Sequence, residues 1–415
     1  MKQEFFVKNR EFINSKLKND SVMVIFSGYM VQKTGDEYYP FTVNRNFYYL
    51  TGLTRENMIY LSVKKDDKVE EFLFIEESNE FIEKWVGDRV KKAEAQDVSG
   101  IKNILYINDF MSRLKSLFNY SHKGVSAETL YLDIDRELNL KPYALSYLEE
   151  FLNNNRELKL VNAQKYFYEA RMIKSDEEIN MMTKAIEMTK NGIEKVMKEI
   201  TPGKNEKAME ALFEYQVKLS NATDLAFQTI MASGAHACVL HYSKNSDILK
   251  ENELLLMDLG ASNGVYNADI SRTIPVDGKF TERQKEIYSI VLDVNKACIA
   301  YAKPGLLLSE LQEYAKKMLA KKCLEIGLIK KEEEVEKYYF HSVSHFLGMN
   351  THDVGIYTLR LKEGMVITIE PGLYISEEKL GIRIEDDILI TKDGAINLSK
   401  DIIKEIDDIE SFMKK

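Results

Sequence analysis

Cysteine, tryptophan and long apolar runs are all scarce in this sequence of 415 residues. Its 3 cysteines are odd in number and lack metal-ligand spacing, which disfavours a disulfide framework and favours a reducing compartment. No segment reaches the roughly 18 consecutive apolar residues of a membrane-spanning helix. Charges are spread through residues 1–12, which therefore contain no signal-peptide core. We expect a cytoplasmic protein.

An excess of positive charge is also missing. The chain has 57 Lys and Arg against 66 Asp and Glu, which gives a net charge of −9. This balance disfavours a nucleic-acid partner and binding to an anionic membrane surface. A content of 45% hydrophobic and 30% charged residues is typical of a soluble globular protein, and the length allows two domains with a large core.

Residues 1–165 predict a mixed α/β domain. This region alternates between strand-like runs at residues 21–27, 47–50, 57–63 and 70–75 and helix-like runs at residues 109–117 and 143–152. No cluster of catalytic residue types occurs in it, and we expect its only histidine, His122, to lie at the surface. Trp85 is the sole tryptophan. We expect it to pack in a core or an interface, with a role in lining a pocket as the alternative.

Two similar pairs of helices are predicted in residues 170–415. The first pair begins with a capping box, Ser175 with Glu178, and is interrupted at Pro202-Gly203 before a helix at residues 205–219. The same plan recurs about 100 residues later, in the capping box Thr281 and Gln284, the break Pro304-Gly305 and the helix at residues 309–326. We therefore predict two similar α–α–β halves, with a sheet between them and helices on the outer face.

The segment 254–273 contains two acidic residues around a predicted hairpin turn. Asn263-Gly264 favours a two-residue type I′ turn, and that register places Asp258 directly opposite Asp269. Their Cβ atoms would then lie roughly 4.5–5.5 Å apart. Like charges in an apolar strand pair need compensation, and a divalent cation is the simplest candidate. The alternative is a solvated hairpin whose carboxylates face water.

The second half repeats this pattern with two glutamates. Glu370 ends a predicted strand at residues 365–370, and Glu385 shares one face of a predicted strand at residues 381–390 with Arg383. Glutamate is atypical among Ile and Val, although an outward-facing partner of Lys or Arg is the alternative. Five of the six histidines lie between His236 and His352, interleaved with these acids. Such clustering is what a metal or acid–base site requires.

Five ordered motifs resemble the aminopeptidase P/prolidase (creatinase-like) branch of the pita-bread metallopeptidases. They are LHY (240–242), MDLGA…NADISRT (257–273), HSVSHFLGMNTHDVG (341–355), TIEPGLY (368–374) and GIRIEDD (381–387). Further similar segments are NFYYLTGL (46–53), EKWVGDR (83–89) and RMIKSDEEI (171–179). The resemblance implies an α/β (α+β) protein with a mixed α/β creatinase-like amino domain, 1–165, and a pita-bread catalytic domain, 170–415, of pseudo-twofold α–α–β halves.

The resemblance also implies a pair of adjacent divalent metal ions. Asp269 and Glu385 would bridge them, Asp258 would bind one ion, and His345 and Glu370 would bind the other. Four carboxylates with one imidazole form a hard, oxygen-rich site that suits Mn²⁺. Two such ions can lower the pKa of a water and polarise a scissile carbonyl.

The remaining roles follow from the same resemblance. Glu370 would also act as general base, and His241 and His352 would bind the substrate carbonyl and the tetrahedral intermediate. His341 would shape the pocket, and Arg383 would orient a metal-binding carboxylate.

The implied reaction removes the first residue from peptides with proline in second position. Ser344, directly before His345, is more similar to aminopeptidase P than to prolidases, so we favour an Xaa-Pro aminopeptidase over an Xaa-Pro dipeptidase. Methionine aminopeptidases lack such an amino domain, and creatinases depart from the ligand set. A non-catalytic peptide-binding protein on the same fold is the alternative from a different class. Expected partners are proline-containing peptides and a second copy of the chain, in a homodimer or larger homo-oligomer.

Overall fold

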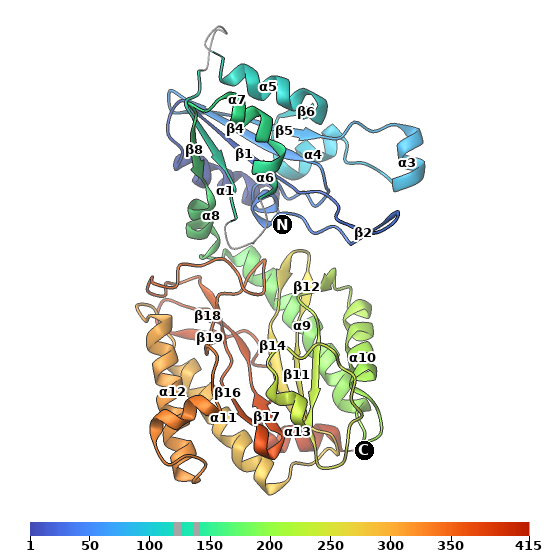
Figure 1. The fold of residues 1–415 in the computed structure, drawn as a ribbon, viewed down its shortest axis with the longest axis vertical. Coiled ribbons are helices and arrows are strands. Elements are labelled where there is room, and N and C mark those ends of the chain that lie inside the picture. The colour runs from blue at the N-terminus through green and yellow to red at the C-terminus, as the bar shows by residue number, and fades with distance from the viewer. Residues whose placement is uncertain (120–125, 136–141, 415) are drawn as a thin grey trace. The chain divides into compact units, whose positions relative to one another are not determined.

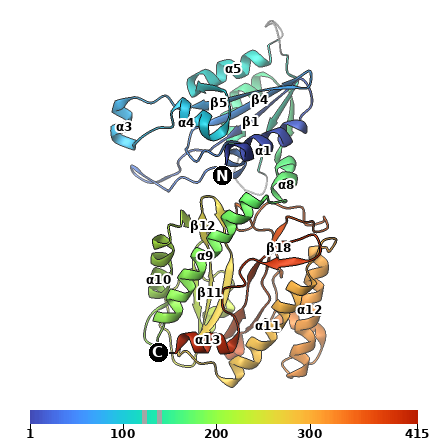
Figure 2. The same cartoon turned by 180° about the vertical axis from the view of Figure 1, so that it is seen from behind.

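A computed structural model describes residues 1–119, 126–135 and 142–414 (Figures 1 and 2). The chain divides into two compact units, Met1–Ala170 and Arg171–Lys415. Among the residues described, no helix is long and apolar enough to cross a membrane. His122, predicted to lie at the surface, falls outside the described residues.

The first unit is built on a six-stranded sheet with the order β6-β5-β4-β1-β7-β8. All six residues of the central strand β1, SVMVIF, are buried, which is typical of a strand covered on both faces. The sheet strands are β1 (Ser21–Phe26), β4 (Ile59–Lys65), β5 (Lys68–Ile75), β6 (Asn103–Tyr106), β7 (Thr129–Leu132) and β8 (Lys159–Asn162), and a separate hairpin is formed by β2 (Gln32–Thr34) and β3 (Glu37–Tyr38). The helices are α1 (Gln3–Ser15), α2 (Arg45–Thr51), α3 (Glu80–Val86), α4 (Lys92–Ser99), α5 (Phe110–Leu117), α6 (Tyr143–Tyr147), α7 (Glu149–Asn154) and α8 (Gln164–Arg171).

The strand predicted at residues 47–50 is wrong, because this segment lies within helix α2. Asn44 caps the helix by accepting a hydrogen bond from the Phe47 amide at 2.9 Å. Gly52 ends it with a φ of 74°, in the left-handed region that favours glycine. The aromatic residues of the segment are buried, so packing outweighs their strand propensity.

Trp85 lies on the surface rather than in a core. Its side chain is 77% exposed on α3, and Phe81, one turn earlier, is 70% exposed. Their ring centroids are 6.4 Å apart. The prediction of core packing is therefore wrong, and packing in an interface stays a prediction.

The second unit contains two helix pairs, as predicted. They are α9 (Asp176–Glu199) with α10 (Glu206–Leu219), and α11 (Glu282–Tyr301) with α12 (Leu308–Glu325); α13 (Ile406–Met413) follows near the end. Both predicted capping boxes are present, at Ser175 and at Thr281. The breaks between the helices of each pair are anchored alike, since the Gly203 amide donates to Leu249 and the Gly305 amide to Leu361. The chain therefore repeats one supersecondary plan in two halves.

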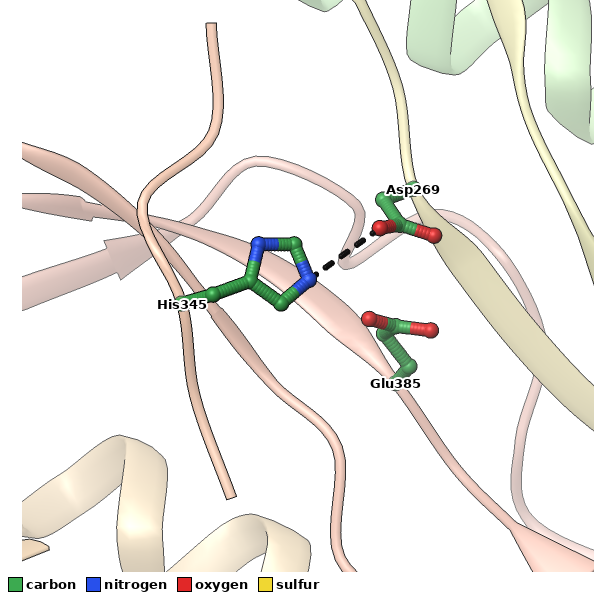
Figure 3. Close-up of side chains that lie close together, drawn as sticks. All are labelled: Asp269, His345 and Glu385. Atoms are coloured by element: carbon green, nitrogen blue, oxygen red, sulfur yellow. Dashed lines mark ion pairs between the residues drawn. The ribbon is translucent and has the colours of Figure 1, made fainter. Parts of the chain in front are cut away.

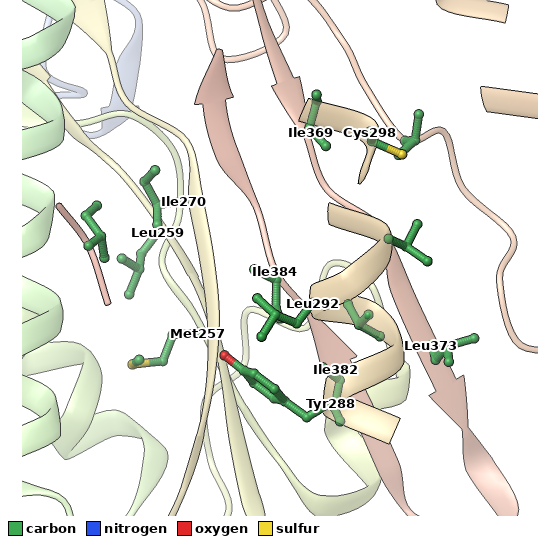
Figure 4. Close-up of a cluster of buried hydrophobic side chains, with 14 of the residues drawn as sticks. Met257, Leu259, Ile270, Tyr288, Leu292, Cys298, Ile369, Leu373, Ile382 and Ile384 are labelled. Carbon is green, nitrogen blue, oxygen red and sulfur yellow. The ribbon is translucent and has the colours of Figure 1, made fainter. Parts of the chain in front are cut away.

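The strands of this unit form several small sheets between the helix pairs, as Figures 1 and 2 show. The first half contributes β9 (Asp224–Leu225), β10 (Ile230–Ser233), β11 (Leu254–Leu259), β12 (Ala261–Asn263), β13 (Tyr266–Asn267) and β14 (Ile270–Pro275). The second half contributes β15 (Val366–Ile369), β16 (Gly372–Ile375), β17 (Leu380–Arg383), β18 (Asp386–Ile390) and β19 (Ala395–Asn397). Thr273 Oγ1 hydrogen-bonds the backbone of Arg383 at 3.1 and 3.2 Å, which joins β14 to β17. Figure 4 shows the buried core beside this junction, with Tyr288 and Leu292 of α11 near Ile382 and Ile384.

The register predicted for the acidic hairpin is wrong, because the turn lies one residue later in the chain than predicted. Asp258 pairs with Ser271 and Asn263 with Tyr266, so the loop residues are Gly264 and Val265. Asn263 stays in β12 because its side-chain amide donates to the Met181 carbonyl on α9 at 3.1 Å, and Gly264 alone supplies the positive φ, 65°. The same register places Gly260 across from Asp269. Asp258 and Asp269 are therefore diagonal neighbours on one face of the hairpin.

Candidate active site

One cavity of about 420 Å³ brings together every residue that the sequence singled out for the site. Its lining includes the predicted ligands and the predicted substrate-contact and positioning residues, which are Asp258, Asp269, His345, Glu370, Glu385, His241, His341, His352 and Arg383. Four further residues that the sequence reasoning did not single out as lining also contribute, namely Leu240, Ser342, Ser344 and Tyr357.

Asp269, His345 and Glu385 form the tightest cluster in this cavity (Figure 3). Each offers a ligand atom within 4.8 Å of the others, and all three side chains are buried. The Nε2 atom of His345 lies 3.3 Å from Asp269 Oδ2 and 3.6 Å from Glu370 Oε1. This arrangement joins one carboxylate of the first half to ligands of the second.

His345 is held so that one ring nitrogen faces the carboxylates. Its Nδ1 atom lies 3.0 Å from the Phe346 carbonyl, to which a protonated Nδ1 donates. Its backbone amide donates to Thr368 Oγ1 at 3.2 Å. Because the Nδ1 hydrogen is used in this way, the Nε2 lone pair is free to bind a cation.

The two glutamates enter the cavity where strands end. Glu370 directly follows β15, and Glu385 lies between β17 and β18, so the single strand predicted at residues 381–390 is in fact two. β17 pairs with β16, whereas β18 pairs with β15, and the chain changes sheets at Glu385. Both glutamates thus lie where the chain passes from one sheet to another.

Arg383 connects carboxylates of the two halves. Its guanidinium lies 2.6 Å from Asp258 Oδ2 and donates to Ser271 Oγ at 2.8 Å. The Ser271 hydroxyl in turn donates to Glu385 Oε2 at 2.7 Å. Sequence reasoning missed Ser271 as a site residue, although it lies within the motif NADISRT.

The buried carboxyl groups destabilise one another when no cation is bound. Burial and the charges of Asp258 and Asp387 raise the pKa of Asp269 well above its ordinary value. Burial and the charges of Asp269 and Glu370 do the same to the pKa of Glu385. Burial raises the pKa of Glu370 to about 7.

The donor set fits a hard divalent cation. It combines carboxylate oxygens with a single imidazole, the ligands that oxygen-preferring divalent ions select. Asp258 Oδ1 is buried, and no hydrogen-bond partner reaches it from the parts of the chain that are described. A cation would satisfy this oxygen and offset the repulsion among the carboxylates.

His341 is a neutral hydrogen-bonding group in this site. Burial and the nearby Arg383 charge lower its pKa to about 4. Its Nδ1 lies 2.8 Å from the Ser342 carbonyl, and its Nε2 lies 2.8 Å from the Tyr374 hydroxyl. Arg383 also donates to that hydroxyl at 3.0 Å, so Tyr374 can accept from Arg383 and donate to His341. Sequence reasoning missed Tyr374, which ends the motif TIEPGLY.

His241 and His352 lie at the solvent-exposed edge of the cavity, unlike the buried His345. The rings of His352 and His345 meet edge to face, with centroids 4.3 Å apart. Partial desolvation of the ring at the cavity edge and the neighbouring His345 lower the pKa of His352. Exposed imidazoles at a cavity mouth can hydrogen-bond a ligand that enters from solvent.

In each half, one helix forms hydrogen bonds to the loop that carries a cavity histidine, His241 in the first half and His341 in the second. In the first half the fully buried Glu206 of α10 accepts hydrogen bonds from the Ser233 amide at 2.8 Å and the Tyr242 hydroxyl at 2.9 Å. In the second half Gln312 of α12 donates to the His341 carbonyl at 3.2 Å and accepts from the Val343 amide at 2.6 Å.

Comparison with known proteins identifies matches to both units. Residues 180–392 match metallopeptidase family M24, and residues 6–125 match the aminopeptidase P N-terminal domain. A Bacillus anthracis structure assigned as an aminopeptidase P is 45% identical with a TM-score of 0.97, covering 100% of this chain and 98% of that one. Aminopeptidase P from Escherichia coli, solved with the inhibitor Pro-Leu, is 28% identical with a TM-score of 0.92, with coverage of 100% and 98%. The Xaa-Pro aminopeptidase of Haemophilus influenzae is 30% identical over 99% of this chain and 97% of its own length.

Proposed function

The chain belongs to metallopeptidase family M24, and on that premise we propose that it is an Xaa-Pro aminopeptidase, which hydrolyses the bond between a first residue and a following proline. The observation that carries this proposal is the convergence of four carboxylates and His345 on one cavity of about 420 Å³. Proline has no backbone N–H and a fixed φ, so a dedicated site is needed for bonds to it.

We propose that two divalent ions occupy this cavity. Asp258 would bind one ion, His345 and Glu370 the other, and Asp269 and Glu385 would lie between them. When bound, such a pair supplies a Lewis acid for the scissile carbonyl and lowers the pKa of the attacking water. The hard donor set supports Mn²⁺ as the native metal.

The other side chains then have distinct tasks. Glu370 accepts the proton of the attacking water, a role that suits a carboxylate that directly follows β15 and lies 3.6 Å from His345 Nε2. His241 and His352 bind the substrate carbonyl from the cavity edge. His341 shapes the wall of the pocket and carries no charge, because burial lowers its pKa. Arg383 holds Asp258 in place through their 2.6 Å ion pair.

We also propose an amino domain at residues 1–165, a catalytic domain at residues 170–415, assembly as a homodimer or larger homo-oligomer, and a cytoplasmic location. The mass in solution would test the assembly. An acidic net charge of −9 supports peptides, rather than nucleic acids, as partners.

Peptide length and the second residue test the function. We expect the protein with Mn²⁺ to release the first residue from Xaa-Pro-Yaa and longer peptides, to cleave Xaa-Pro dipeptides poorly, and to cleave Xaa-Ala-Yaa far more slowly. Glu370→Gln with both ions bound is the control for contaminating peptidases. Turnover of dipeptides alone would identify an Xaa-Pro dipeptidase, and tight peptide binding without any hydrolysis would identify a non-catalytic binding protein.

A further inference from the structure

Asn295 of α11 contacts the backbone behind both glutamates of the site. Its side chain is fully buried, and its Nδ2 atom donates to the Ile369 carbonyl at 3.1 Å and to the Ile384 carbonyl at 3.2 Å. These carbonyls belong to the residues that directly precede Glu370 and Glu385. One amide group therefore touches both chain segments that bring glutamates into the cavity.

The amide has only one orientation that satisfies its neighbours. Its Oδ1 atom accepts a hydrogen bond from Lys404 Nζ at 2.7 Å, and the same Nζ lies 2.5 Å from Asp386 Oδ2. A flipped amide would point its NH₂ group at the lysine cation and its oxygen at two carbonyls. Lys404 thus fixes which end of Asn295 faces the glutamate backbone.

The same buried network reaches Glu385 from its other side. Asp386 Oδ1 lies 2.8 Å from the guanidinium of Arg272, which is 1% exposed. Arg272 in turn donates to the Glu385 carbonyl at 2.6 Å. The carbonyls before and after the Glu385 nitrogen are therefore both held by side chains that no solvent reaches.

The position of Asn295 matches the places where the chain changes sheets. At Glu370 the chain passes from β15 to β16, and at Glu385 from β17 to β18, so each segment leaves one sheet for another. Ile369 is the last residue of β15, and Ile384 follows the end of β17. Asn295 therefore donates to both segments at the points where each leaves its sheet.

We propose that Asn295 is a positioning residue for the metal centre, which sets the separation of Glu370 and Glu385 by tying their preceding carbonyls to one amide. The inference rests on the proposed two-metal site and adds a residue outside the cavity to it. Partners of ligating groups contribute about 10- to 100-fold to metal affinity when they orient the ligands.

Metal titration of the full chain tests this role directly. The protein is stripped with EDTA, dialysed, and titrated with Mn²⁺ by calorimetry. Asn295→Leu keeps the branched shape of the side chain and removes both donors, and we expect it to weaken Mn²⁺ binding by about 10- to 100-fold. Asn295→Asp keeps the Lys404 contact but also lacks the donors, so it tests the same point if the leucine variant does not fold.

Gln284 provides a matched control on the same helix. It is a buried amide that donates to the Asn252 carbonyl at 2.8 Å, away from the cavity. Gln284→Met should lower the unfolding temperature without changing Mn²⁺ affinity. Equal affinity in Asn295→Leu and wild type, or equal losses in Asn295→Leu and Gln284→Met, would overturn the positioning role. Absence of Mn²⁺ binding to the wild-type chain would instead overturn the metal centre itself.

Discussion

The two halves of the second unit deliver carboxylates to one cavity by different means. In the first half, one register runs through the hairpin, from the Asp258–Ser271 pair to the Asn263–Tyr266 pair. In the second half, the glutamates lie at the points where the chain changes sheets. Asp269 lies between β13 and β14, which also belong to different sheets, and its backbone amide donates to the Asp387 carboxylate at 3.2 Å. The carbonyls before the two glutamates instead accept hydrogen bonds from a single amide, that of Asn295. A repeated supersecondary plan therefore does not repeat its supporting contacts.

Metal removal should have the largest effect and should involve both halves equally. We expect EDTA treatment to abolish peptide hydrolysis and Mn²⁺ to restore it. Asp269→Asn in the first half and Glu385→Gln in the second should each lose metal and activity together, because both residues lie between the two proposed ions. Metal content by atomic emission and hydrolysis rates check this. Full activity in chelated protein would rule out the metal reading.

Glu370→Gln should have the next largest effect and should distinguish the second half, which supplies the general base, from the first half, whose acids are only metal ligands. The change keeps the shape of the side chain and an oxygen that can bind metal, but it removes the basic oxygen. We expect kcat to fall by about 10²–10⁴-fold with a much smaller change in KM, because substrate binding rests on other residues. Metal content is the control. A variant with both ions bound and nearly normal kcat would leave Glu370 as a ligand only.

The stability of the metal-free protein should depend on the same carboxyl group. Burial raises the Glu370 pKa from 4.5 to about 7, so the unfolded chain gives up this proton first as the pH rises. The free energy of unfolding therefore decreases as the pH rises from 4.5 to about 7. Metal-free Glu370→Gln should match wild type near pH ~4 and exceed it by a few kcal/mol, on the order of the shift, above pH ~7.

Urea unfolding of the two EDTA-treated proteins at both pH values checks this difference. His341 and His352, whose pKa values burial lowers, act in the opposite direction. Both histidines are present in both proteins. Loss of the Glu370 charge also lowers the raised pKa values of Asp269 and Glu385, which adds to the stability of the variant at high pH. A constant difference in free energy across the range would contradict the assignment.

The smallest effects should come from the helices behind the histidine loops. Glu206→Gln weakens an acceptor with several donors, including the Ser233 amide and the Tyr242 hydroxyl, and we expect a loss of about 2 kcal/mol. Gln312→Met removes neutral hydrogen bonds to the loop of His341, and we expect about 1 kcal/mol. Thermal unfolding measures both. A larger loss of stability in Gln312→Met than in Glu206→Gln would show that the charge of Glu206 does not strengthen its hydrogen bonds.

The sequence predicted the fold class and the helix pairs correctly because these follow from local patterns. Capping boxes such as Ser175 with Glu178 and breaks such as Pro202-Gly203 depend on neighbours in sequence. The site residues were also brought into one cavity as their motifs indicated, since each half presents its acids from strands that meet.

Apart from the exposed Trp85, the errors arose where contacts distant in sequence decide the local structure. The hairpin register depends on Asn263, whose amide binds Met181 on a helix far away in sequence, rather than on turn preference alone. Residues 47–50 have the composition of a strand but are buried as a helix. The break at Glu385 reflects pairing with two sheets, which no periodicity within residues 381–390 reports. Asn295 was not singled out because its partners are backbone carbonyls.

The exposure of Trp85 has a spectroscopic consequence. It is the sole tryptophan, and 77% of its side chain is in contact with solvent in the folded chain. Its indole emission is therefore that of a hydrated fluorophore before any denaturant is added, and unfolding of the second unit will change it little. The 23 tyrosines and the far-ultraviolet circular dichroism are the signals that follow the fold. Trp85 itself becomes a local probe, whose blue shift and protection from iodide quenching would report anything that covers helix α3.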